Sequence, residues 1–258
     1  MAGTPARPSR RHRRTVRRRR RLAAVLRRRR RLGRICRFLR RWTLRCVALV
    51  LVVVIGLRWV DPPVTYLMAA EWIRLGHIER QWVPVSEMSE SLPLSAAAAE
   101  DARFCRHDGF DFDAIRDALA DERRLRGAST ISQQVAKNVF LWPARSWLRK
   151  GLEAGFTVLI ELTWPKRRIM EVYLNVAEFG EGVFGVQAAA QHYFGRDASA
   201  VSAAQAARLM AILPDPKRRS ANRQSRFMRS RSAAIVSGAE TLRKEGRADC
   251  FLPPDTGA

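Results

Sequence analysis

An arginine-rich arm at the N-terminus most constrains how this chain of 258 residues can fold. Residues 1–45 contain 20 arginines, no lysine and no carboxylate, whereas the other 213 residues contain 28 basic and 24 acidic side chains. Twenty of the 24 net positive charges therefore belong to one terminal segment, and the folded core has to lie beyond it. A nucleic-acid-binding fold with basic residues spread over its surface is disfavoured.

An uncharged run of twelve residues, 46–57, follows the arm between Arg45 and Arg58. Twelve residues are short for a membrane span and are typical of a core helix or a signal-peptide segment. Interfacial tryptophans and snorkelling arginines extend the segment to residues 42–60, which rise roughly 28 Å as a helix. We therefore predict an uncleaved, single-pass anchor over residues 42–60. The positive-inside rule places the N-terminus in the cytoplasm and the rest of the chain in the periplasm.

The four cysteines, Cys36, Cys46, Cys105 and Cys250, indicate no metal motif, because no two stand at Cys-x2-4-Cys spacing. Beyond the anchor, Cys105 and Cys250 would lie in an oxidising compartment and could pair. The sequence does not decide between a bridge and two free thiols, and our expectation is that they are unpaired.

Apolar spacing predicts a mainly α protein with few strand signals. Helices are expected at residues 96–103, 112–119, 147–160, 169–174, 202–213 and 227–244, with a capping box at Ser202 and Gln205. The expected organisation is an arm (1–41), an anchor (42–60), a juxtamembrane segment (61–92), a catalytic core (93–216) and a basic C-terminal helix and tail (217–258).

Three polar stretches could support chemistry. A carboxylate at Glu100, after an alanine-rich helix, would be partly desolvated and suited to proton transfer; the alternative is a solvated helix end with His107 and Asp111 as local caps. Residues 127–134 are small, hydroxylated and amide-rich, which suits a sugar ligand; the alternative is a loop entering a helix capped by Ser129 or Ser132.

The third stretch gathers cations around a glutamate. Lys137, Arg145, Arg149 and Lys150 lie within fourteen positions, a cluster that suits a phosphate or pyrophosphate. The alternative is an ordinary intrahelical ion pair, since Arg149 and Lys150 stand four and three residues before Glu153.

Five motifs in this order resemble those of the family 51 peptidoglycan glycosyltransferases, over residues 92–216. They are Glu-Asp-x-Arg-Phe-x-x-His-x-Gly-Phe-Asp from Glu100, Gly-x-Ser-Thr-Ile-x-Gln-Gln from Gly127, Arg-Lys-x-x-Glu from Arg149, Arg-x-Ile-Met-Glu-x-Tyr-Leu-Asn from Arg167, and Gly-x-x-Gly-Val-x-Ala-Ala-Ala-x-x-Tyr-Phe-Gly from Gly182. Cys105 and Gln205 depart from the usual pattern without touching a residue assigned to catalysis. A monofunctional member is expected, because 258 residues leave no room for a penicillin-binding domain.

The resemblance implies a lysozyme-like helical domain with a membrane-proximal jaw lobe, which polymerises lipid II at the bacterial inner membrane. The acceptor 4-hydroxyl would attack the donor anomeric carbon and release undecaprenyl pyrophosphate, with inversion to a β-1,4 link. Implied partners are lipid II, the growing glycan strand and membrane lipids, with other cell-wall synthases and division proteins as candidates and no nucleic acid.

The resemblance also assigns roles to residues. Glu100 matches the catalytic base, and Glu153 matches a second essential glutamate, near which a divalent metal, Mg²⁺ or Mn²⁺, is a cofactor that the sequence leaves undecided. Lys137 and Arg145 match residues that neutralise the leaving diphosphate, with Arg149 and Lys150 supporting Glu153. The expected substrate contacts further include Ser129, Thr130, Gln133, Gln134 and Asp101, whereas His107, Glu171, Tyr173 and Asn175 are expected to be mainly structural.

Two rival functions remain open on sequence. A lysozyme-like hydrolase or lytic transglycosylase would also use a catalytic glutamate, but it has no need for a cation cluster or for anchoring in the lipid plane. An inactive, membrane-tethered scaffold of the wall-synthesis complex is disfavoured, because both Glu100 and Glu153 are present.

Overall fold

The computed structural model describes residues 35–120, 129–144, 146–223 and 225–252. The chain divides into two units, Met1–Val53 and Val54–Ala258. Residues 35–53 of the first unit and residues 54–56 of the second are helical. All other described elements belong to the second unit.

The second unit is built mainly of helices, which confirms the predicted class. The α-helices are α2 (Tyr66–Leu75), α3 (Ser91–Glu100), α4 (Phe112–Ala120), α5 (Ile131–Phe140), α6 (Trp147–Thr163), α7 (Lys166–Val176), α8 (Val186–Phe194), α9 (Ala203–Ile212) and α10 (Arg226–Lys244). The 3-10 helices are η1 (Val85–Glu87), η2 (Phe104–Arg106) and η4 (Ala198–Ala200), and the strands are β1 (Glu79–Arg80), β2 (Glu178–Gly180) and β3 (Val183–Phe184).

The helix at residues 35–56 ends before the predicted anchor does. The anchor over residues 42–60 stays a prediction, and residues 54–60, which belong to the second unit, bond to other residues of that unit. Val54 is fully buried and its carbonyl accepts from Trp164 Nε1 at 2.8 Å, while Arg168 Nη2 donates to Leu57 O at 3.1 Å and Val60 O at 2.9 Å. Within the described parts of the chain, no helix is both long enough and apolar enough to cross a bilayer.

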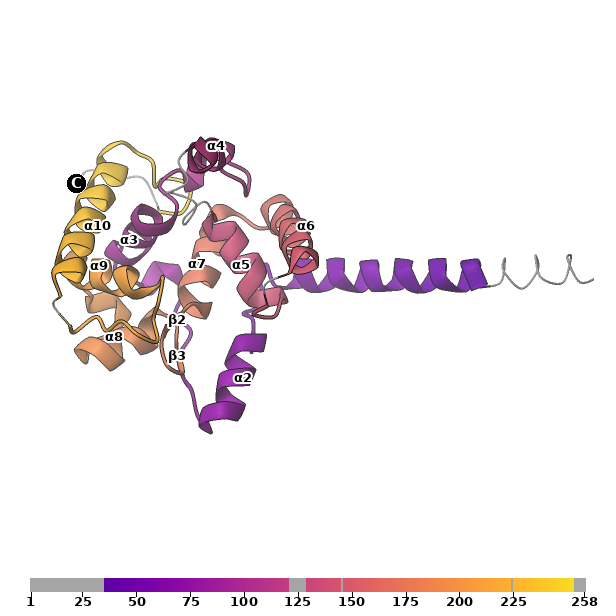
Figure 1. Cartoon of the computed structure of the whole chain (residues 1–258), viewed down its shortest axis with the longest axis horizontal. Helices are drawn as coiled ribbons and strands as arrows, with labels where there is room; N and C mark the ends of the chain where they lie inside the picture. Colours follow the sequence, from indigo (N-terminus) through magenta and orange to yellow (C-terminus); the bar gives the residue numbers. More distant parts are fainter. Residues whose placement is uncertain (1–34, 121–128, 145, 224, 253–258) are drawn as a thin grey trace, which may run out of the picture. The chain divides into compact units, whose positions relative to one another are not determined.

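Helices α3, α9 and α10 lie side by side (Figure 1). Small side chains permit this approach, since Ala96 on α3 and Ala207 on α9 are fully buried. A Cβ added to Gly238 of α10 would lie 3.3 Å from the Cβ of Ala98 on α3, closer than most such contacts. The packing places α10 against the helix that ends at Glu100.

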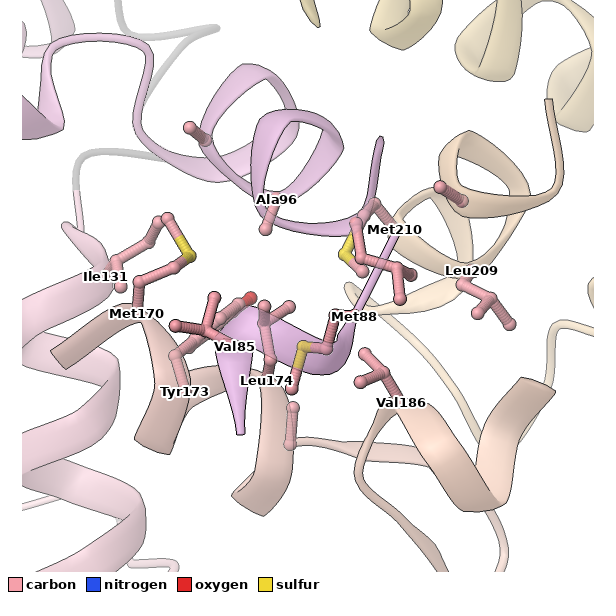
Figure 2. Packing of buried hydrophobic residues seen from close by; sticks show 14 of the residues in the cluster. Val85, Met88, Ala96, Ile131, Met170, Tyr173, Leu174, Val186, Leu209 and Met210 are labelled. Carbon is pink, nitrogen blue, oxygen red and sulfur yellow. The ribbon is translucent and has the colours of Figure 1, made fainter. Parts of the chain in front are cut away.

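Helix α7 supplies the centre of the core, as Figure 2 shows. Its Met170, Tyr173 and Leu174 are at most 1% exposed, and Figure 2 places them opposite Ala96 and Ile131. Apolar residues at positions i, i+3 and i+4 produce this buried face. Helix α5 packs against both α6 and α7, so the core sets where the side chains of α5 point.

The sheet is short, in line with the sparse strand signals. Its order is β1-β3-β2, with β1 parallel and β2 antiparallel to β3. Gly185 follows β3 with φ of +81°, and a Cβ there would lie 2.9 Å from Asn175 O. Only glycine fits this contact between the hairpin and α7.

Cys105 and Cys250 form a disulfide, with their Cα atoms 5.7 Å apart. Our expectation of two free thiols is wrong. Sequence separation hid the pairing, because Cys105 follows α3 and Cys250 follows α10, and these two helices pack together. Cys36 and Cys46 are free and exposed.

The apolar stripe predicted on α6 divides between the core and solvent. Ile160 is fully buried, and the Phe156 ring stacks on Phe140 at 4.6 Å. Trp147 is 93% exposed and Leu148 71% exposed. The buried face of α6 instead includes the carboxylate of Glu153, at 3% exposure.

Candidate active site

Glu100 is the last residue of α3, and two other helices direct polar groups at its carboxylate. Gln134 Nε2 on α5 donates to Oε2 at 3.0 Å, and Arg231 Nη2 on α10 lies 3.6 Å from Oε1. Burial raises the pKa of Glu100, and the Gln134 bond and the charges of Arg231 and Lys137 offset part of that rise. A carboxylate with a raised pKa is a suitable proton acceptor for a sugar hydroxyl.

A pocket of about 280 Å³ opens beside Glu100. Its lining residues come from the end of α3, the start of α4 and the segment before α5, namely Ala98, Ala99, Glu100, Asp101, Ala102, Arg103, Asp111, Ala114, Ser129 and Thr130. The structure therefore brings the first two predicted polar stretches together. Arg103 Nε donates to Asp111 Oδ2 at 2.8 Å, which fixes a cation at the rim.

The start of α5 is set by a capping box. Thr130 Oγ1 accepts from Gln133 N, and Gln133 Oε1 accepts from Thr130 N at 3.0 Å. Ser129 and Ser132, the caps of the alternative interpretation of this stretch, are not the N-cap, because the helix begins at Ile131. The box is a structural role for Thr130 and Gln133, and it aims the next residue, Gln134, at Glu100.

Both carboxylate oxygens of Asp101, which lines the first pocket, have a bonding partner. Oδ2 accepts from Ile131 N at 3.0 Å, and Oδ1 lies 2.9 Å from His107 Nε2. Gly109 N donates to His107 Nδ1, so the ring proton is on Nε2 and points at Asp101. Asp101 is 7% exposed and both of its oxygens are bonded, so it positions α5; its predicted substrate contact stays a prediction.

The third predicted stretch builds a second site around Glu153. Arg149 Nη1 donates to Oε2 at 2.6 Å, and Lys150 Nζ donates to Oε1. A pocket of about 340 Å³ lies alongside, lined by Leu67, Lys137, Asn138, Leu141, Trp142, Pro143, Ala144 and Arg149. The intrahelical ion pair and the cation cluster, which were alternatives on sequence, are therefore both present. Arg145 lies outside the described residues.

Lys137 links the two sites electrostatically. Burial lowers its pKa, and the charge of Glu153, and more weakly that of Glu100, raises it again. Lys137 sits on α5 one turn after Gln134, so one helix presents an amide to the first glutamate and an ammonium to the second site.

Two features were not found from the sequence. Arg231 was assigned to a basic helix with no role at the site, and no local spacing relates it to Glu100. Beneath the pocket, Ser132 Oγ donates to Glu161, and Lys166 Nζ donates to Glu161 Oε1 at 2.9 Å and to His107 O at 2.6 Å. The polar pattern of α6 and α7 is the available signal for that network.

A buried carboxylate beside one pocket and a cation cluster beside the next are the groups expected of an enzyme that activates a hydroxyl and stabilises an anionic leaving group, as glycosyl transfer from a phosphate-linked sugar requires. Residues 69–240 match the Transglycosylase family. A biosynthetic peptidoglycan transglycosylase of Jannaschia sp. (strain CCS1) is 52% identical over 217 residues, which are 83% of this chain and 90% of that relative. The proteins of the same name from Rhodospirillum centenum (strain ATCC 51521 / SW) and Caulobacter vibrioides (strain ATCC 19089 / CIP 103742 / CB 15) are 49% identical over 86% of this chain and 47% identical over 85%, covering 100% and 99% of those relatives. The chain belongs to the transglycosylase family and is a peptidoglycan glycosyltransferase.

Proposed function

We propose that the enzyme polymerises lipid II by attack of an acceptor 4-hydroxyl on the donor anomeric carbon, which forms a β-1,4 link with inversion and releases undecaprenyl pyrophosphate. Such a reaction needs a base for a weakly acidic hydroxyl and cations for a leaving pyrophosphate. The observation that supports this assignment is that α5 connects a desolvated carboxylate with a cation-lined pocket: Gln134 bonds Glu100, and Lys137 lines the pocket.

Glu100 takes the proton of the acceptor hydroxyl. It lines the first pocket together with Ser129 and Thr130, whose hydroxyls can hydrogen-bond a sugar. Gln134 donates a hydrogen bond to the Glu100 carboxylate, and Gln133 is part of the capping box that fixes the first turn of α5, from which Gln134 projects. Substrate contact by these four residues is part of the proposal.

Lys137 and Arg149 face the second pocket and neutralise the leaving pyrophosphate, with Lys150 and Arg145 assisting. Glu153 holds Arg149 and Lys150 in place through its two oxygens. The buried carboxylate therefore orients cations, and the cations stay available on their other donors for phosphate oxygens.

A divalent metal, Mg²⁺ or Mn²⁺, does not fit at Glu153. Both carboxylate oxygens already accept from cations, and Lys137 adds a third positive charge nearby. Asp101, His107 and Asp111 place donor atoms within 4.8 Å of one another, but Asp101 is bonded to His107 and Asp111 to Arg103. No step of the proposed reaction uses a metal.

The proposed setting is the periplasmic face of the bacterial inner membrane, with the arginine arm in the cytoplasm. The arm, the uncharged run after it and the disulfide of an oxidising compartment support this topology. In the second unit, Trp72 and Ile73 of α2 are 59% and 82% exposed, so α2 can contact lipid as part of a jaw lobe. In intact spheroplasts, a membrane-impermeant maleimide should label a Lys244→Cys variant and leave Cys36 unlabelled; labelling of Cys36 would refute the topology.

One assay tests the reaction. Purified protein is incubated with labelled lipid II in detergent, with and without EDTA. Wild type should form glycan polymer in both conditions, and Glu100→Gln should form none. Polymerisation by Glu100→Gln at the wild-type rate would refute the base assignment, whereas cleavage of preformed glycan would indicate the rival hydrolase.

A further inference from the structure

The residues directly after Glu100 are attached to the C-terminus of the chain. We call residues 101–107, which lead from Asp101 through η2 to His107, the strap, and residues 245–252, which follow α10, the clamp. The clamp lies beyond residues 69–240, the part that matches the family.

Three contacts of different kinds join clamp to strap. Cys250 is disulfide-bonded to Cys105, and Arg247 Nη2 donates to Ala102 O at 2.7 Å. The Phe251 ring lies 5.9 Å from the Phe104 ring, and both side chains are 1% exposed. Covalent, polar and apolar contacts along the same seven residues fix the strap far more firmly than its own 3-10 turn could.

The strap in turn positions the groups around the catalytic base. Asp101 at its start accepts from Ile131 N at the first turn of α5 and is held by His107 at the strap's end. The same first turns of α5 place Gln134 against Glu100. A displacement of the strap would therefore move both the end of α3 and the helix that holds the Glu100 carboxylate.

We propose that the clamp is a redox-dependent positioning element: the Cys105–Cys250 disulfide holds the strap so that Glu100 stays desolvated and aligned. The proposal rests on the role of Glu100 as base. Opening the bond requires a dithiol reductant, whose two thiols give two electrons and two protons and become a disulfide, while Cys105 and Cys250 become thiols. The oxidised state is the active state.

The test compares oxidised and dithiothreitol-reduced wild-type enzyme in the lipid II assay, with kcat and KM measured across pH. Reduction should lower kcat about tenfold, because a small misplacement of a catalytic group is costly, and leave KM for lipid II unchanged. The acid limb of the kcat profile should move to lower pH, because water reaching Glu100 lessens the desolvation that raises its pKa. A purely stabilising disulfide would leave that limb in place.

Variants separate the clamp from general thiol effects. Cys105→Ser/Cys250→Ser should be slow in both redox states, and Cys36→Ser/Cys46→Ser should respond to reduction like wild type. Arg247→Ala keeps the disulfide and removes the bond to Ala102 together with an ion pair to Glu245 inside the clamp, so it should give a smaller loss of kcat in the same direction. If Cys105→Ser/Cys250→Ser does not fold, Arg247→Ala and reduced wild type test the proposal without it.

If reduced wild type and Arg247→Ala both keep the kcat and pH profile of the oxidised enzyme, the proposal is wrong, even where reduction lowers the melting temperature. Glu100→Gln in the oxidised state keeps the two proposals apart. Activity in Glu100→Gln contradicts the base assignment. If Glu100→Gln is inactive and reduction leaves kcat and the pH profile of wild type unchanged, only the proposal for the clamp is wrong.

Discussion

Gln134 donates from Nε2 to Oε2 of Glu100 at 3.0 Å, across 34 residues of sequence. This bond joins the end of α3 to α5. It lowers the pKa of Glu100, whereas burial raises it. A hydrogen bond to the charged carboxylate favours that form, so Gln134 opposes the rise in the pKa of Glu100 that burial causes.

Replacing Gln134 by alanine should therefore raise the pKa of Glu100 further. The acid limb of the kcat profile moves to higher pH, and kcat at a fixed pH on that limb falls by about tenfold for a rise of one pKa unit. Gln191→Ala is the matched control, because Gln191 is an exposed glutamine on α8 bonded to Asp197. An unshifted acid limb in Gln134→Ala would mean that Gln134 contacts substrate rather than tuning the base.

The Cys105–Cys250 disulfide should also contribute to global stability, apart from any effect on kcat. It closes a loop with a sequence separation of 145, and removing a native disulfide typically costs about 2–5 kcal/mol. Urea unfolding of Cys105→Ser/Cys250→Ser, followed by tryptophan fluorescence, should show that loss in the free energy of unfolding. Cys36→Ser/Cys46→Ser should unfold like wild type, and an equal loss in both double variants would contradict the assignment.

Gly185 should tolerate no side chain, because its φ of +81° and its 2.9 Å approach to Asn175 O both exclude a Cβ. We expect Gly185→Ala to lower the free energy of unfolding by about 3 kcal/mol, the upper range for a strained backbone. Gly195→Ala is the matched control, because Gly195 also has a positive φ but a Cβ there meets nothing within 4 Å; its cost is about 1 kcal/mol. Equal costs in the two variants would exclude the contact with Asn175 as the cause.

Local patterns predicted what depends on neighbours in sequence. Apolar spacing located α3, α4, α6, α7, α9 and α10 but not α2, α5 or α8, and the Ser202 and Gln205 box was found as expected. Contacts between residues far apart in the chain could not be predicted from the sequence. The pairs Cys105 with Cys250 and Arg231 with Glu100 both depend on the packing of α10 against α3. The choice of Thr130 as cap over its serine neighbours depended on the residue at which the helix begins, which periodicity defines only to within a residue or two.

The basic limb of the pH profile should depend on Glu153 through Lys137. Burial lowers the pKa of Lys137, Arg149 and Lys150 lower it further, and Glu153 is the main group that raises it. Glu153→Gln removes that support, so Lys137 loses its proton at lower pH and can no longer neutralise the leaving pyrophosphate. The basic limb of kcat should then move toward neutral pH.

Glu161→Gln controls for the loss of a buried carboxylate from α6, since Glu161 binds Ser132 and Lys166 instead. It should reduce stability and leave the basic limb unmoved. A metal-binding role for Glu153 predicts a different result: Glu153→Gln would abolish stimulation by Mg²⁺ or Mn²⁺ and leave the basic limb where it was. Arg149 and Lys150 already occupy both oxygens of Glu153. We therefore expect the basic limb to shift in Glu153→Gln, and we expect neither wild type nor the variant to be stimulated by Mg²⁺ or Mn²⁺.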